Sequence, residues 1–102
     1  MVTKENITGK QRAYLRSLAN KVPAIFQIGK GGVTDEIVSQ LRVALEKREL
    51  IKVTVLETAF MTPREACTIV CEKIGAEAVQ CIGNKFVIYK ESRDNKEIIL
   101  PR

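Results

Sequence analysis

The chain of 102 residues has no tryptophan, no histidine and an aromatic content of 5%. Without histidine it lacks the side chain that most often acts as a general base near neutral pH. No carboxylate pair stands out from its polar stretches either. With so few aromatic residues, the core must consist mainly of Ile, Val, Leu and Ala. The composition therefore gives no support to an enzyme.

Long apolar runs are also absent. Nothing approaches the ~20 residues that a membrane-spanning helix needs, and the first ten residues, MVTKENITGK, contain no apolar stretch of signal-peptide length. The hydrophobic content of 45% is nevertheless typical of a globular chain. We therefore expect one domain over residues 1–102, located in the cytoplasm, with neither a membrane partner nor a small-molecule substrate.

Cysteine occurs three times, at Cys67, Cys71 and Cys81. A disulfide framework uses an even number of cysteines. The four-residue separation of Cys67 and Cys71 is not a zinc-ribbon spacing, and no histidine is present to complete a metal site. The sequence predicts reduced, buried thiols, with neither metal nor cofactor.

Acidic residues are scarce at the start of the chain. Residues 1–33 hold six Lys and Arg against one Glu, whereas residues 34–102 hold eleven of each sign, so the net charge of +5 lies entirely in the first third. Arg12 and Arg16 are four residues apart, a repulsive spacing on a helix that no neighbouring acid offsets. Segregated positive charge indicates either a solvated basic helix or an anionic partner, foremost nucleic acid.

Local patterns predict alternating helices and strands. Thr8 with Gln11 has the form of a capping box, and Thr62 with Pro63 and Glu65 is a second helix start. Gly83-Asn84 indicates a hairpin of the II′ type. The predicted elements are a helix at about 9–20, a strand at 24–28, a helix at 34–48, a strand at 50–55, a helix at 62–74 and strands at 78–82 and 85–90.

The order α-β-α-β-α-β-β predicts an α/β (α+β) fold of two layers, in which helices pack on a mixed four-stranded sheet. Strands joined through helices should pair in parallel, and the closing hairpin should add an antiparallel strand. Phe86 and Tyr89 are three residues apart on one strand and so point to opposite faces. That argues against base stacking on an RNP1-type sheet face.

The segment IGKGGVTDEI places three glycines around Lys30, between a strand and a helix. It fails the Walker A pattern, because no Gly-Lys-Ser/Thr follows, and it fails the dinucleotide pattern G-x-G-x-x-G, because position 34 is Thr. It does match G-x-x-G, which in KH domains clamps an RNA backbone.

Two readings of this loop remain open. A tight left-handed turn would need one or two glycines, whereas a third glycine beside a lysine favours close contact with a ligand. Asp35 and Glu36 disfavour an anion on the axis of the following helix. We therefore expect a phosphate at the side of the loop, near Lys30 and the first helix.

Several motifs together resemble the YhbY family, the stand-alone form of the CRM (chloroplast RNA splicing and ribosome maturation) domain. They are ITGKQRAYLRSLAN, IFQIGKGGVTDEIV, ALEKRELIKVTV, IGNKFVIYK and IILPR, and they cover nearly the whole chain. The resemblance implies the fold of the C-terminal domain of bacterial translation initiation factor three. It also implies RNA binding and, in bacteria, association with precursors of the large ribosomal subunit.

From the resemblance and the charge pattern we expect a non-catalytic protein that contacts ribosomal RNA through its GxxG loop and basic first helix. The candidate RNA-binding residues are Lys10, Arg12, Arg16, Lys21, Gly29, Lys30, Gly31 and Gly32. An alternative is a protein-interaction module that docks on ribosomal proteins through residues 98–100. The stretch VLETAFMTPREA departs from the family pattern, and Phe60 and Met61 are either core residues or an exposed contact.

Overall fold

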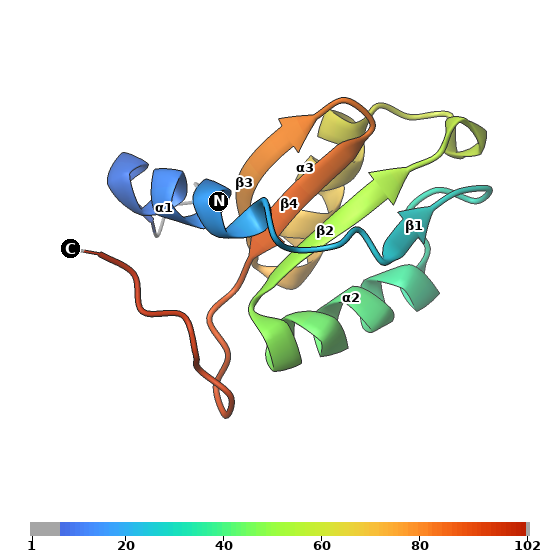
Figure 1. Ribbon diagram of the computed structural model, residues 1–102. Helices are drawn as coiled ribbons and strands as arrows, with labels where there is room; N and C mark the ends of the chain where they lie inside the picture. The colour runs from blue at the N-terminus through green and yellow to red at the C-terminus, as the bar shows by residue number, and fades with distance from the viewer. Residues whose placement is uncertain (1–6, 102) are drawn as a thin grey trace.

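The computed structural model describes residues 7–101 and has the predicted order of elements (Figure 1). The helices are α1 (Gly9–Ala19), α2 (Asp35–Arg48) and α3 (Pro63–Ile74). The strands are β1 (Phe26–Ile28), β2 (Leu50–Val55), β3 (Glu77–Ile82) and β4 (Lys85–Tyr89). A short 3-10 turn, η1 (Glu57–Ala59), was not predicted, and β1 is shorter than the expected strand at 24–28.

Both predicted capping boxes are present. The Thr8 hydroxyl accepts from the Gln11 backbone N–H at 3.1 Å, and the Gln11 side chain accepts from the Thr8 backbone N–H at 2.9 Å. Thr62 and Glu65 repeat this exchange at 3.0 and 2.8 Å. Each box satisfies two N–H groups that a helix start leaves unpaired. The starts of α1 and α3 are therefore determined locally.

The strands form one mixed sheet in the order β1-β2-β4-β3. β1 and β2, which α2 joins, are parallel as expected. β2 and β3 do not pair, because β4 lies between them and is antiparallel to both. The pairing expected of strands joined through a helix therefore holds for the first crossover and fails for the second. Gly83 has φ 58 and Asn84 has no positive φ, which agrees with the predicted II′ hairpin.

Helices cover both faces of the sheet. α2 and α3 pack on one face, around Ile28, Leu41, Val53, Val70 and Phe86. On the other face α1 packs with Leu15 against Val87 and Tyr89. The expected two layers describe the α2–α3 side, and the structure adds α1 as a layer on the opposite side. Phe86 and Tyr89 do face opposite ways, as predicted.

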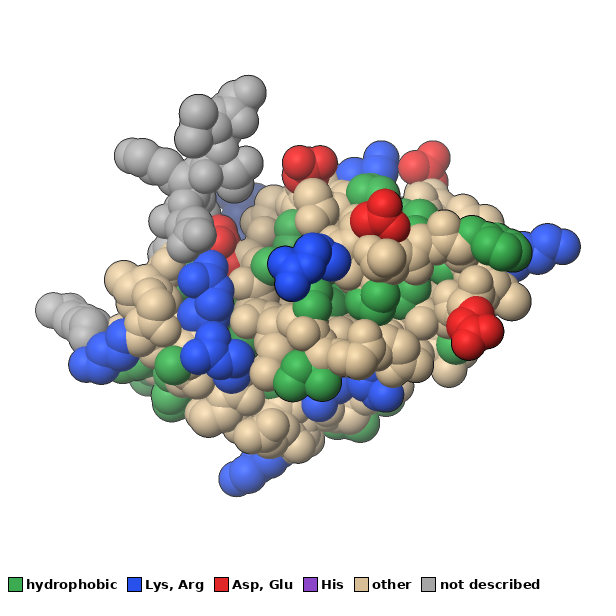
Figure 2. Space-filling view, turned by 90° about the horizontal axis from the view of Figure 1, so that it is seen from above, with side chains coloured by type: hydrophobic (Ala, Val, Ile, Leu, Met, Phe, Trp, Pro, Cys, Tyr) green, Lys and Arg blue, Asp and Glu red, His purple; other side chains and the backbone are tan. Residues whose placement is uncertain are grey.

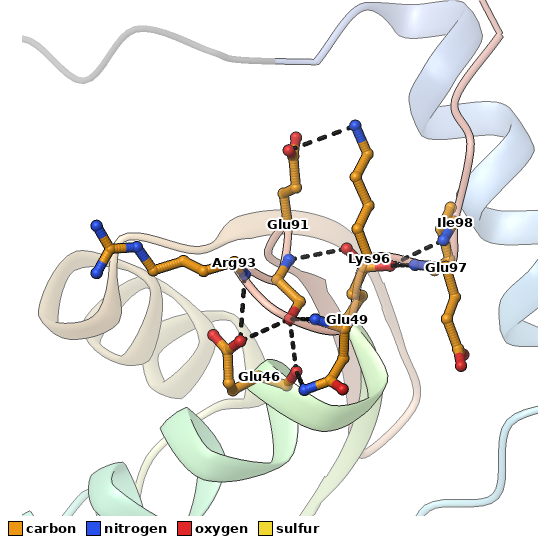
Figure 3. Close-up of polar contacts among 9 residues, drawn as sticks. Glu46, Glu49, Glu91, Arg93, Lys96, Glu97 and Ile98 are labelled. Carbon is orange, nitrogen blue, oxygen red and sulfur yellow. Dashed lines mark hydrogen bonds and ion pairs between the residues drawn. The ribbon is translucent and has the colours of Figure 1, made fainter.

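The segment after β4 is tied to the C-terminal end of α2 by two carboxylates (Figure 3). Glu49 is fully buried and accepts the backbone N–H groups of Ser92, Glu97 and Ile98, each at 2.8 Å. Glu46 accepts the Ser92 hydroxyl at 2.6 Å. Ile98 and Leu100 then pack against the α1 side of the sheet. The tail is therefore part of the folded unit.

The thiols are free, as predicted, but only Cys67 is buried, while Cys71 and Cys81 are half-buried. The contact with Cys71 and burial raise the pKa of Cys67, and burial is also the main cause that raises the pKa of Cys81. Both thiols are thus kept protonated. Within residues 7–101 no helix combines the length and apolarity that crossing a bilayer requires.

Candidate nucleic-acid interface

Residues 29–32 form a tight turn between β1 and α2. The Gly32 N–H donates to the Gly29 carbonyl at 2.9 Å. Gly31 has φ +95 whereas Lys30 has no positive φ, the pattern of a type II turn with Lys30 at its second position. Lys30 is exposed there. The turn therefore presents one cation at its corner, in front of α2, which Thr34 caps.

Each glycine of the turn has a structural reason. Gly31 and Gly32 have φ values of +95 and +67, which L side chains rarely adopt. At Gly29 an added Cβ would lie 3.3 Å from both Leu56 Cδ1 and Thr58 Oγ1. The number of glycines is thus explained without a ligand. The case for a binding site rests on the exposed Lys30 and its surroundings.

A second loop, residues 56–61, packs beside this turn. The Leu56 N–H donates to the Ile28 carbonyl at 2.8 Å, and Met61 Cε lies 3.0 Å from where a Gly32 Cβ would be. Met61 is half-buried against the core, whereas the Phe60 side chain is 92% exposed. The sequence left open whether this pair belongs to the core or forms an exposed contact. The structure shows that Met61 packs against the core and that Phe60 is exposed.

The β3–β4 hairpin reaches the same edge, since the Val55 N–H donates to the Asn84 carbonyl at 2.7 Å. We call this edge the loop end, defined as residues 29–32, residues 56–61 and the hairpin residues Gly83 and Asn84. Figure 1 shows the loops after β1 and β2 projecting together at one end of the sheet. Lys30 is the one cation and Phe60 the one aromatic residue of the loop end, and both are exposed.

The basic residues of α1 do not lie beside the glycine turn. Figure 1 places α1 at the opposite end of the sheet from the loop end. The Arg12 Nε–H donates to the Ala78 carbonyl of β3 at 3.1 Å, so this side chain also holds α1 on the sheet. Lys10 and Arg16 are exposed on α1. The expected phosphate site between Lys30 and the first helix is therefore wrong; the two are separate surfaces.

Lys21 has cationic neighbours that the sequence analysis missed. It lines a groove of about 290 Å³ with Lys47 and Arg48 from the last turn of α2, and Glu97 of the tail is the one acid in its lining. We call this the α1–α2 groove. Basic residues in a last helical turn usually complement the helix dipole, so nothing in the sequence distinguished this pair as part of a surface.

Lys52 lies between the two ends of the sheet on its α1 face, whereas Lys85, whose Nζ donates to the Asn84 Oδ1 at 3.2 Å, lies on the same face next to the loop end. β2 alternates, so that Leu50, Lys52 and Thr54 share a face, and Lys85 pairs with Thr54 from β4. Lys85 is exposed and Lys52 is half-buried. Figure 2 shows basic side chains toward the α1 end, others nearer the middle and one projecting at the loop end, with acidic side chains among them. The positive charge is therefore spread along the molecule.

Residues 7–90 match the family model described as the CRS1 / YhbY (CRM) domain. The match spans every helix and strand of the fold and includes both the glycine turn and α1.

Curated proteins of similar sequence cover almost the whole chain. "Probable RNA-binding protein YqeI" of Bacillus subtilis is 46% identical over 95 residues, which are 93% of this chain and 99% of that protein. An "RNA-binding protein" of Haemophilus influenzae is 31% identical over 96 residues, or 94% and 96% of the two chains. The solution structure of SAV1595 from Staphylococcus aureus superposes with a TM-score of 0.75 at 46% identity, covering 93% of this chain and 99% of that one.

Proposed function

We propose that the protein binds RNA without catalysis, on the premise that its chain belongs to the CRS1 / YhbY (CRM) domain family. The observation that carries this proposal is the family match over residues 7–90, together with relatives that are named as RNA-binding proteins. The exposed lysine at a hydrogen-bonded turn supports the location of the site.

The proposed contacts are electrostatic and lie on two surfaces. Lys30 binds phosphate at the loop end, where the glycine turn allows the backbone to approach closely. Lys10, Arg16 and Lys21 bind phosphates at the α1 end, and Lys47 and Arg48 extend that surface along the α1–α2 groove. Arg12 is assigned to the same surface, in addition to its bond with Ala78. Contacts of this kind position the RNA and carry little sequence information.

We further propose that the RNA is ribosomal and belongs to large-subunit precursors in the cytoplasm. This finer assignment rests on the family resemblance of the motifs described above. Crosslinking the protein to RNA in cells and mapping the linked nucleotides tests it. Crosslinks confined to RNAs other than ribosomal RNA would contradict the ribosomal role and leave RNA binding intact.

Salt dependence tests the electrostatic mechanism. If roughly four phosphates are bound, log K should fall with log salt with a slope of about −3 to −4. Lys30→Ala should weaken binding and reduce the slope by about one, while thermal stability stays close to wild type because the side chain is exposed. An affinity that is insensitive to salt would contradict the electrostatic mechanism. A Lys30→Ala variant that loses stability but not affinity would contradict it as well.

One structural feature supports the alternative function, which is docking on ribosomal proteins. Of the three tail residues first considered, Ile98 and Leu100 pack inward and Ile99 is 80% exposed. Deleting the tail would therefore disturb the fold, and Ile99→Ser is the sharper variant. Loss of particle association in Ile99→Ser with unchanged affinity for free RNA would favour this alternative.

A further inference from the structure

Phe60 occupies an unusual position at the loop end. Its side chain is 92% exposed, and its backbone has φ 55 and ψ 37, in the left-handed region that favours glycine or asparagine. Single exposed apolar residues are common on protein surfaces. Here the exposed residue is a large aromatic at a backbone position that suits a small residue better, which neither packing nor turn geometry explains.

The turn that carries Phe60 is fixed on both sides. The Phe60 N–H donates to the Glu57 carbonyl at 3.1 Å, and the Ala59 N–H donates to the Leu56 carbonyl at 3.0 Å. Ala59 is buried, and Met61 packs against the core beside Gly32. The backbone around the ring is anchored while the ring itself points to solvent. Phe60 is therefore held outward by the fold.

The glycine turn lies directly beside this loop. Leu56 and Thr58 pack against Gly29, with Leu56 Cδ1 and Thr58 Oγ1 each 3.3 Å from where a Gly29 Cβ would be. Lys30 follows Gly29 and is exposed. An exposed cation and an exposed ring thus project from two loops that are in contact. A single nucleotide offers the matching pair of groups, a phosphate and a planar base.

We propose that Phe60 is a stacking platform for one unpaired RNA base at the loop end, beside a phosphate bound at Lys30. The inference rests on the proposed RNA-binding function and specifies the form of RNA that this site takes. Stacking on aromatic rings is a common way to hold unpaired bases, and it tolerates any base because each has a π-face. Paired bases inside a helix cannot offer that face.

The surroundings of Phe60 favour a base over the other occupants. Glu57 lies in the same 3-10 turn and would repel a phosphate, so the phosphate belongs at Lys30. Exposed polar residues, Glu57, Thr58 and Thr62, flank the ring in the sequence, and Leu56, which is 36% exposed, packs against Gly29. A protein-docking patch would be a contiguous apolar area of several hundred Å². One ring set among polar groups suits a single base.

The absence of tryptophan from the chain allows a direct test. Phe60→Trp introduces a single tryptophan at the proposed site, and a stacked base should quench its fluorescence. Titration with a single-stranded decamer RNA should therefore quench it, whereas a blunt duplex of the same sequence should leave it nearly unchanged. The same quenching by both RNAs, or by neither while both bind, would overturn the inference.

Affinity measurements separate this inference from the function on which it rests. Phe60→Ala should weaken binding of the single-stranded decamer by between about five- and a hundredfold and change binding of the duplex little. Phe60→Leu, which keeps apolar bulk without a ring, should lose as much, and Phe60→Tyr should keep wild-type affinity. Because the ring is 92% exposed, all these variants should melt like wild type.

Each contrary result has a distinct meaning. If Phe60→Ala binds like wild type under conditions in which Lys30→Ala is weakened, the stacking role is wrong and RNA binding stands. If Phe60→Leu binds like wild type, the contact is merely apolar and the stacking role is wrong. If Phe60→Ala loses association with a protein partner and binds RNA normally, the ring is a protein contact. If the wild-type protein binds neither RNA, the proposed function itself fails.

Discussion

At the scale of single residues, Gly32 is a position in the glycine turn at which an added side chain would disturb both the backbone and a packed neighbour. Its φ is +67, and an added Cβ would lie 3.0 Å from Met61 Cε. Because that atom is the end of a flexible side chain, the backbone conformation supplies most of the penalty. We expect Gly32→Ala to lower the free energy of unfolding by about 1–2 kcal/mol, measured by chemical denaturation.

Gly9 provides the matched control for this substitution. It is the first residue of α1, and an added Cβ there would meet nothing within 4 Å. Gly9→Ala should therefore be neutral or stabilise by up to about 1 kcal/mol. Equal stability changes in the two variants would show that the left-handed backbone at position 32 is not what requires glycine.

Phe60 and Met61 show why some residue environments could not be predicted. Both are large and apolar, and they stand side by side in the stretch ETAFMTP. Their environments differ because Phe60 adopts a left-handed φ of 55, which turns the chain so that Met61 faces the core. The spacing of apolar residues along the sequence does not indicate where a single residue adopts the left-handed conformation. The identity of Lys30 as an exposed turn residue, by contrast, follows from its glycine neighbours.

At the scale of elements, the junction of α2 and β2 depends on Glu49. This residue ends α2 with φ 65 and is fully buried. In the sequence EKREL it is typical of a charged surface residue. Its burial depends on partners more than 40 positions later in the chain, such as Glu97 and Ile98. Local patterns predicted the capping boxes correctly because those contacts join residues three positions apart. They could not predict the contacts between Glu49 and the tail, which join residues far apart in the sequence.

Glu49→Gln should loosen the tail. Three backbone N–H groups donate to the carboxylate, and an amide offers one oxygen and turns an NH₂ group toward the remaining donor. We expect a loss of about 2–3 kcal/mol in the free energy of unfolding and faster amide hydrogen exchange at Ile98. Glu97→Gln is the matched control, since it removes the same charge from an exposed side chain of the same segment.

The loss of stability at acidic pH, which we call the acid limb of the stability profile, gives a second measurement of the contact between Glu49 and the tail. Burial would raise the pKa of Glu49, but the N–H groups of Ile98, Ser92 and Glu97 outweigh it, so the pKa is lowered. The Ser92 hydroxyl is the main cause that lowers the pKa of Glu46. A lowered native pKa gives stability that is complete above the unfolded value of about 4.3 and is lost as pH falls through the native value. Glu49→Gln should flatten this limb; an unchanged limb would contradict the assignment.

The order of the strands marks the limit of what element patterns predict. Runs of apolar residues, several of them alternating with polar ones, predicted all four strands, and the helix caps marked where the helices begin. The Gly83-Asn84 pair predicted the hairpin. Whether β4 adds to the outside of β3 or lies between β2 and β3 depends on which arrangement buries Val53, Phe86 and Ile88 beneath α2 and α3. The observed order gives β4 a partner on each side and leaves β3 at the edge. The strand order is therefore set by tertiary packing, and no local sequence pattern predicts it.

At the scale of the whole molecule, the proposed RNA contacts lie at two ends of one sheet. α1 packs over the end of β2 that begins with Leu50, and the loop end follows Val55. Six strand residues at about 3.3 Å each separate the ends by roughly 20 Å. In stacked, helical geometry a strand rises about 3.4 Å per nucleotide, so this distance corresponds to about six nucleotides. A stacked RNA strand must therefore exceed that length to contact both surfaces.

The length of the RNA should accordingly decide how two charge reversals combine. Arg16→Glu at the α1 end and Lys30→Glu at the loop end are far enough apart for their effects on the free energy of binding to add within about 0.5 kcal/mol. That additivity is expected for an RNA of 20 nucleotides, measured by fluorescence anisotropy. For an RNA of two nucleotides, which is too short to contact both ends, only the reversal at the occupied end should matter. Full additivity on the short RNA would mean that both side chains contact one site, and the two-ended surface would be wrong.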